Sequence, residues 1–159
     1  MKNKMKMVLM LLVTLCVMIP LLGCSAEDLQ KAEIESLMNT FENACTAMDI
    51  DAALDCIDPK VTAPVKAIRG VVGYFLGETD MSAKFFDLLG QMSGGSVEEP
   101  QDFFGNMHID IGKVRADSKK ATVTAAVTCN VAGRQIVRDA RFRCICEAGQ
   151  WYISGFSFK

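Results

Sequence analysis

Seven cysteines occur among the 159 residues of this chain. Thiols form disulfides, bind soft metals and act as nucleophiles. Cys45 and Cys56 are placed symmetrically about a turn expected at Ile50 and Asp51, so an antiparallel helical hairpin would bring them face to face. This spacing allows a disulfide between them, and the favoured alternative is that both are small buried hydrophobes.

Three further thiols lie in the C-terminal third, at Cys129, Cys144 and Cys146. Cys144 and Cys146 are two residues apart in an alternating segment, so they share one face of a strand and cannot easily bridge each other. A Cys-x-Cys spacing without a second pair of ligands is not typical of zinc. We therefore expect three core thiols and no metal site.

His108 is the single histidine, and Asp110 follows two residues later. Such a pair inside a cavity could transfer protons. The alternation of the segment instead sets both residues opposite Ile109 and Ile111, which favours the solvent face of a strand. No serine or cysteine beside His108 completes a nucleophilic triad. The sequence thus predicts no catalytic residue, and the alternative is proton transfer by these two residues and Tyr74.

Four residues are candidates for binding a ligand: Arg138, Tyr74, Phe142 and Trp151. The alternation puts Arg138 on the same strand face as Phe142, near the open end of the expected sheet. A buried arginine needs a carboxylate or an anionic ligand, and the alternative is an arginine that reaches solvent at the rim. The three aromatic residues could line a cavity, although aromatic residues at such positions usually belong to the core.

The N-terminal stretch has the order of an export signal. Three lysines precede an apolar run at residues 7–19, and Leu21-Leu22-Gly23-Cys24 follows. These four residues resemble the lipobox of bacterial lipoproteins, in which the cysteine is fatty-acylated on sulfur and becomes the new N-terminus. The resemblance implies a signal peptide at residues 1–23, lipidation of Cys24, and attachment through it to the extracytoplasmic face of the cell membrane.

The alternative for the apolar run is an uncleaved transmembrane helix. A spanning helix needs about 20 apolar residues, whereas the run at residues 7–22 is shorter and contains Pro20. Cleavage is therefore the favoured interpretation. It leaves residues 24–26 as a short lipidated stub and residues 27–159 as a single domain, because a chain of this length fits one core.

Without residues 1–23 the chain has fourteen Lys and Arg against nineteen Asp and Glu, a net charge of −5 with His108 neutral. Nucleic-acid binding needs a basic surface, so this net charge argues against a nucleic-acid partner. The same balance argues against a protein that lies flat on anionic lipid, and it leaves the acyl group as the means of membrane attachment.

The first half of the chain has helical periodicity. Apolar residues of the first stretch form one stripe: Ile34, Leu37, Met38, Phe41, Cys45 and Met48. A second, short helix is expected with Asp51 as its cap, a third after Thr62 and a fourth with Ser82 as its cap. Residues 97–106 have the composition of a loop.

The second half has a period of two, which predicts four antiparallel strands. The first covers residues 107–115, with a bulge at Gly112. A turn near Gly133 pairs Val127 with about residue 140, and a tight turn after it pairs Cys146 with Trp151. Helices followed by a meander of strands give an α+β fold, with the N-terminal helices packed on a curved four-stranded sheet.

Three stretches carry a resemblance to the nuclear transport factor two-like superfamily, which has the cystatin-like cone fold. They are the helical hairpin at residues 41–54, the strand at residues 120–125 and the closing segment at residues 149–156. Within this superfamily the chain is similar to lumazine-binding-like and uncharacterised exported lipoproteins. The resemblance implies a curved sheet that wraps a long helix and leaves a conical cavity, and it implies no cofactor.

The leading hypothesis is a membrane-tethered module that holds a small apolar or anionic ligand, or a partner segment, in this cone without catalysis. The alternative is a ketosteroid-isomerase-like or SnoaL-like isomerase or dehydratase, which needs an acid or base inside an apolar pocket. A third hypothesis is an envelope protein that forms a homodimer through the outer face of the sheet, around Thr122, Thr124, Arg141 and Arg143.

Overall fold

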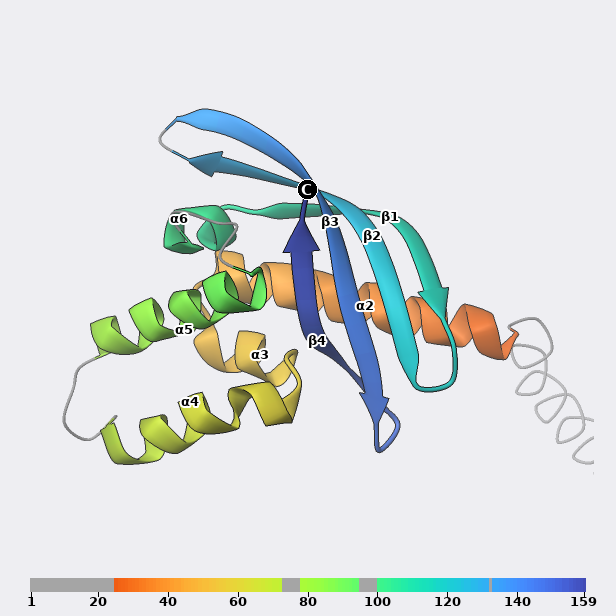
Figure 1. The fold of residues 1–159 in the computed structure, drawn as a ribbon, viewed down its shortest axis with the longest axis horizontal. Helices are drawn as coiled ribbons and strands as arrows, with labels where there is room; N and C mark the ends of the chain where they lie inside the picture. Colours follow the sequence, from red (N-terminus) through yellow and green to blue (C-terminus); the bar gives the residue numbers. More distant parts are fainter. Residues whose placement is uncertain (1–24, 73–77, 95–99, 132) are drawn as a thin grey trace, which may run out of the picture.

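The structure is a computed structural model that describes residues 25–72, 78–94, 100–131 and 133–159. The expected signal peptide, Cys24 and Tyr74 lie outside these ranges. Helices come first along the chain, and a four-stranded antiparallel sheet with the order β1-β2-β3-β4 follows (Figure 1). This confirms the α+β arrangement that the sequence predicts.

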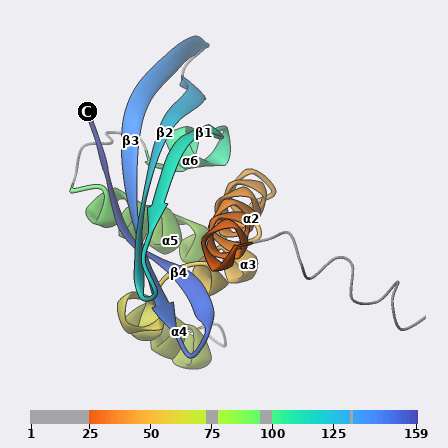
Figure 2. The same ribbon diagram turned by 90° about the vertical axis from the view of Figure 1, so that its right-hand side faces the viewer.

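The longest helix, α2 (Ala26–Thr46), lies across one face of the sheet, and Figure 2 looks along it from its N-terminal end. Ser25 and Asp28 form a capping box, in which each side chain accepts a hydrogen bond from the other residue's N–H at 3.2 Å. Leu37 is only half-buried and Met48 is 42% exposed, so the buried stripe is narrower than predicted. Its buried members are Ile34, Met38, Phe41, Ala44 and Cys45.

Four shorter helices follow α2 in the described ranges, and their starts differ from the sequence prediction. α3 (Ile50–Asp55) is capped by Asp49, which accepts a hydrogen bond from the N–H of Ala52 at 3.1 Å, so the cap lies two residues before Asp51. α4 (Pro59–Val72) begins at a proline rather than after Thr62, because the fixed φ of proline suits the first helical position.

The last two helices also extend beyond the predicted limits. α5 (Glu78–Met92) begins before Ser82, the expected cap. α6 (Pro100–Gly105) forms within the stretch predicted as a loop, again with proline at its first position. Among the described helices, none combines the length and the apolar composition that crossing a membrane requires.

The sheet is a meander of β1 (His108–Ala116), β2 (Lys120–Val131), β3 (Arg134–Glu147) and β4 (Gln150–Phe158). The bulge predicted in β1 is confirmed by a register shift between Ile111 and Lys113. Cys146 pairs with Trp151 as predicted, whereas Val127 pairs with Arg138 instead of residue 140. A shift of two residues keeps inward side chains opposite inward side chains, so the buried faces are the predicted ones.

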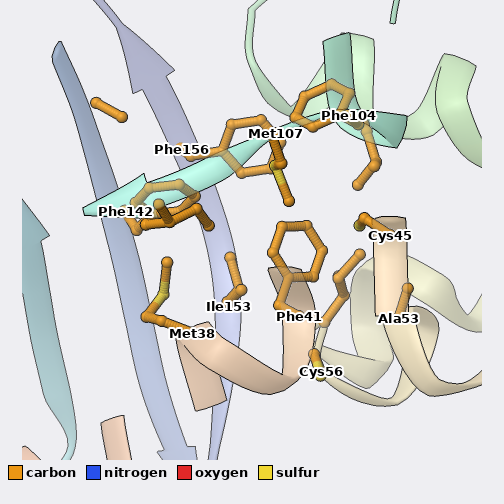
Figure 3. Packing of buried hydrophobic residues seen from close by; sticks show 14 of the residues in the cluster. Met38, Phe41, Cys45, Ala53, Cys56, Phe104, Met107, Phe142, Ile153 and Phe156 are labelled. Carbon is orange, nitrogen blue, oxygen red and sulfur yellow. The ribbon is translucent and has the colours of Figure 1, made fainter. Parts of the chain in front are cut away.

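Side chains from the helices and the strands share one buried cluster between α2 and the sheet (Figure 3). Phe41 of α2 is fully buried, and Phe142 and Phe156 of the sheet are 1% exposed. The ring of Phe156 lies 5.6 Å from the ring of Phe142 and 5.6 Å from that of Phe104, measured between centroids. These aromatic side chains and Met38 occupy the space between helix and sheet where the resemblance implies a cavity.

Both edge strands are fastened to the helical layer. Glu42 of α2 accepts a hydrogen bond from the N–H of Ile109 at 2.9 Å, and its other carboxylate oxygen lies 2.8 Å from Nδ1 of His108. At the opposite edge, the N–H of Ile153 donates to the carbonyl of Cys56 at 2.8 Å. These contacts fix α2 and the end of α3 relative to β1 and β4.

Candidate functional site: a groove along helix α2

An apolar groove of about 660 Å³ runs along the side of α2 that faces away from the core. Its volume lies within the range of small-ligand pockets. Ala52 and Asp55 of α3, the following Cys56, and Gly149, Gln150 and Trp151 at the β3–β4 turn also line it. The wall on α2 consists of Leu29, Ala32, Glu33, Ser36, Leu37 and Thr40.

Small side chains create the hollow on the α2 side. Ala32, Ser36 and Thr40 are four residues apart, so they form one row along the helix. The hydroxyl of Thr40 donates to the carbonyl of Ser36 at 2.8 Å, which satisfies it within the helix. Leu29, which is 55% exposed, and half-buried Leu37 add larger apolar surfaces to the same side. The groove therefore has an apolar lining and little unsatisfied polarity along α2.

The tight turn between β3 and β4 contributes residues to the groove lining. Ala148 and Gly149 have φ values of 52° and 82°, a left-handed conformation at both central positions of the turn. The turn brings Trp151, 5% exposed, to the groove lining opposite Cys146 in the ladder. Trp151 is the single tryptophan of the chain. Its indole is therefore a specific reporter of the groove.

Among the described residues of the groove lining, the charged ones are the carboxylates Glu33 and Asp55, and none is a lysine, arginine or histidine. Asp55 is paired with Nζ of Lys66 at 2.8 Å. Burial, with a smaller contribution from Asp55, raises the pKa of Cys56 to about 11, so its thiol is protonated at neutral pH. This lining suits a neutral apolar molecule, or one with a cationic group near Glu33, better than an anion.

The structure separates the residues that the sequence nominates for ligand binding. Trp151 lines the groove, whereas Phe142 lies in the packed core beside Phe156. Arg138 is half-buried on the inner face of β3, opposite Val127, and it acts electrostatically on Cys129. Tyr74 lies outside the described residues. A role for these four residues in binding stays a prediction, and among the described ones the groove includes only Trp151.

The two nominated acid–base residues on β1 lie on its solvent side. His108 and Asp110 are exposed, while Ile109 between them is 4% exposed and belongs to the core. This agrees with the alternation of the sequence. The hydrogen bond that the His108 ring donates to the Glu42 carboxylate, supported by the charges of Glu42 and Asp110, raises the pKa of His108. Neither residue points into the interior or into the α2 groove, where isomerase chemistry would need it.

The described cysteines are free thiols. Burial is the main cause that raises the pKa of Cys45, with a smaller contribution from Cys56. Burial likewise raises the pKa of Cys144 to about 12. The disulfide that the spacing allows between Cys45 and Cys56 is not formed in the structure, and it stays a hypothesis. Within the described ranges, no three His, Cys, Asp or Glu side chains gather in a way that could hold a metal ion.

The sequence analysis did not predict the groove, because it considered only the apolar stripe of α2 and not the residues on the exposed side of this helix. The available signal was the row Ala32, Ser36 and Thr40 beside the exposed apolar residue Leu29. A row of small residues on an exposed helix face marks a shallow surface, but it does not say what forms the opposite wall. That wall depends on α3 and on the β3–β4 turn, which are distant along the chain.

No family model and no curated protein matches the sequence. The fold is similar to that of an NTF-2 like protein of unknown function from Shewanella oneidensis MR-1, with a TM-score of 0.51 and 10% identity over 81% of this chain and 98% of that one. It is also similar to a protein of unknown function with a cystatin-like fold from Nostoc punctiforme PCC 73102, with a TM-score of 0.50 and 14% identity over 84% and 91% of the two chains. At these identities the likeness shows the fold alone, and the chain has the NTF2-like, cystatin-like fold.

Proposed function

We propose that the protein is a membrane-tethered extracytoplasmic lipoprotein whose domain binds a small apolar molecule, or an apolar segment of a partner, in the α2 groove without catalysis. The observation that carries this proposal is the contrast between two spaces. The interior between α2 and the sheet is filled by side chains such as Phe41 and Phe142, whereas the groove offers about 660 Å³ with an apolar lining. Ligands bind preferentially in concave apolar surfaces that already exist.

The shape of the groove favours an elongated ligand. Its lining on α2 extends from Leu29 to Thr40, a length of about 16 Å at the helical rise per residue. A ligand along this wall would cover Leu29 and approach Trp151. Glu33 would favour a cationic group over an anionic one at the rim. The resemblance to lumazine-binding-like exported lipoproteins supports a small-molecule ligand as well.

Fluorescence of Trp151 tests the binding site directly. The protein is titrated with N-phenyl-1-naphthylamine, a neutral apolar fluorophore, and energy transfer from the tryptophan is followed. We expect saturable transfer with a Kd in the micromolar range, typical of a small apolar ligand in a preformed pocket. Dodecylamine should displace the probe at lower concentration than dodecanoate, because the described part of the groove lining has two carboxylates and no basic side chain.

A matched pair of variants locates the site. Ala32→Phe places a ring in the groove and should weaken probe binding at least tenfold. Ala83→Phe makes the same substitution at an exposed position of α5 outside the groove and should leave binding unchanged. Thermal unfolding of both variants checks that they remain folded. Absence of saturable binding, or an equal loss in both variants, would contradict the proposed site.

The tether is tested separately from the groove. Mass spectrometry of the mature protein should find Cys24 as the first residue with fatty acyl groups on it, and the Cys24→Ala variant should not yield this species. The wild type should fractionate with membranes. A mature chain that begins at Met1 and carries no lipid would remove the tether from the proposal and leave ligand binding in the groove untouched.

A further inference from the structure

Charge is divided unevenly between the two layers of the molecule. Residues 25–107 contain five Lys and Arg against fifteen Asp and Glu, whereas residues 108–159 contain nine against four. The sheet is thus a basic layer within an acidic domain, and the sum of −5 over residues 25–159 conceals it. A surface that attracts an anion has to be sought on the sheet.

Four of these basic residues lie close together at the end of the first hairpin, in residues 113–120, called here the basic hairpin. Lys113 and Arg115 are exposed on β1, opposite Thr124 and Thr122. Lys119 and Lys120 follow in and after the turn, and both are exposed.

The basic hairpin contains one carboxylate, and this carboxylate stabilises the turn. Asp117 accepts hydrogen bonds from the N–H groups of Lys119 and Lys120, each at 2.9 Å, and so shapes the turn. Within the described part of the chain, no carboxylate comes within ion-pair distance of the four basic side chains. Their charges are therefore open to an external anion.

The position of the basic hairpin suggests what that anion is. Figures 1 and 2 both place the β1–β2 turn beside the N-terminal end of α2. The helix begins at Ala26 with Ser25 as its cap, and the two residues from Cys24 to Ser25 extend at most about 7 Å. A lipid on Cys24 would therefore hold this end of the domain against the phospholipid headgroups.

Acidic residues at the start of α2 oppose this contact only weakly. Glu27 and Asp28 lie in the first turn, where the positive end of the helix dipole offsets negative charge. Asp28 also accepts hydrogen bonds from the N–H and the hydroxyl of Ser25, at 3.2 and 2.8 Å. Within the basic hairpin, Asp117 interacts electrostatically with Lys120, and the described carboxylates form no ion pair with its four basic side chains.

We propose that the basic hairpin docks on anionic phospholipid headgroups of the membrane to which Cys24 is attached. The proposal rests on the tether of the proposed function. The acyl group supplies attachment, and the hairpin sets the orientation, because cations near an anionic bilayer surface are attracted within a Debye length of it. In this orientation the end of the groove at Leu29 lies on the bilayer side.

Lysine footprinting of the mature acylated protein tests the orientation. The protein is reconstituted in vesicles of phosphatidylcholine, or of phosphatidylcholine and phosphatidylglycerol at a ratio of about 7:3, and acetylated with a water-soluble ester. We expect Lys113, Lys119 and Lys120 to react about fivefold more slowly on the anionic vesicles. An attraction of about 1 kcal/mol per cation lowers the fraction of each lysine that is free of the membrane by this factor. Lys60 and Lys66 of α4 serve as internal controls and should react equally on both. High salt should remove the difference.

Two double variants distinguish an effect of the hairpin lysines from an effect of the protein's total charge. Lys119→Ala with Lys120→Ala should remove most of the protection of Lys113, whereas Lys66→Ala with Arg134→Ala, which lowers the charge equally at exposed sites elsewhere, should not. Equal acetylation of the hairpin on both vesicles, or equal effects of the two double variants, would overturn the proposal.

Failure of the tether gives a different result. A protein that does not float with neutral phosphatidylcholine vesicles lacks the anchor, whatever the hairpin does. Acetylation of the same protein mixed with anionic vesicles at low salt then still measures whether the hairpin lysines are protected by contact with the membrane. Protection of Lys119 and Lys120 there would support the docking surface, and its absence would overturn it.

Discussion

The two sides of α2 differ in burial and in what they contact. The side toward the sheet carries Ile34, Met38 and Phe41, all fully buried. The opposite side carries Ala32, Ser36 and an exposed Leu29, and it forms one wall of the groove. One helix thus supplies both the centre of the core and the surface that remains open to a ligand.

This difference teaches where a cone fold can place a binding site. Large aromatic side chains in the interior stabilise the domain by burying apolar area, and they occupy the space between α2 and the sheet. Small residues on the outside cost little stability and leave a hollow between neighbouring elements. The same fold can therefore keep its core solid and bind on the outer side of its longest helix.

The largest effect is expected from the inner side of α2. Phe41→Ala should lower the free energy of unfolding by about 3–5 kcal/mol, because it removes a buried ring and leaves a cavity. Urea denaturation measures the loss. Phe41→Leu, which keeps most of the volume, should cost clearly less. A loss below about 1 kcal/mol for the alanine variant would show that the interior is looser than the structure indicates.

The next effect concerns the contact between α2 and β1. Glu42→Ala should lower the free energy of unfolding by about 1–3 kcal/mol, because it leaves the N–H of Ile109 without its acceptor. Glu35→Ala on the same helix is the control. Glu35 forms an exposed ion pair with Lys31, four residues earlier on the helix, so the substitution should cost about 0.5 kcal/mol or less. Equal losses would contradict a special role of Glu42.

A smaller effect is expected from pH. The hydrogen bond with Glu42 raises the pKa of His108, so the protonated ring stabilises the folded state. This contribution is complete below the unfolded-state pKa of about 6.5 and is lost as the pH rises through the higher folded-state pKa. NMR titration of the single histidine measures the shift directly. Glu42→Gln should bring the pKa back toward its ordinary value, and a wild-type pKa at or below that value would refute the interpretation.

The smallest effect is expected from the outer side of α2. Leu29→Ala should change the free energy of unfolding by about 0.5 kcal/mol or less, because the side chain is 55% exposed. The same variant should weaken binding of the naphthylamine probe severalfold, since Leu29 lines the groove. A large loss of stability without a loss of binding would reverse the assignment of the two sides.

The local periodicity of apolar residues predicted the helices and strands in which this periodicity is regular. The helical spacing of Ile34, Met38 and Phe41 identified the inner side of α2, and the bulge near Gly112 followed from a break in alternation. These features depend on residues close together in the sequence. The cap of α3 and the start of α4 at Pro59 were placed wrongly, because several neighbouring residues were suitable at each boundary.

Features that depend on distant segments could not be read in the same way. The pairing of Val127 with Arg138 depends on how the intervening turn is built, and alternation alone does not distinguish registers that differ by two. The groove needs α3 and Trp151 beside α2, which no local pattern encodes. The overall negative charge also concealed the basic hairpin, because a sum over the chain says nothing about position.

The bulge in β1 has a consequence for how copies of the protein behave when crowded. β1 is an outer strand, and an exposed outer strand can pair with a neighbouring molecule and begin aggregation. In β1 the N–H of Ile109 already donates a hydrogen bond to Glu42. The hydrogen-bond ladder between β1 and β2 is interrupted at Gly112. A Cβ added at Gly112 would lie 3.2 Å from the carbonyl oxygen of Thr124. The irregularity thus discourages intermolecular strand pairing.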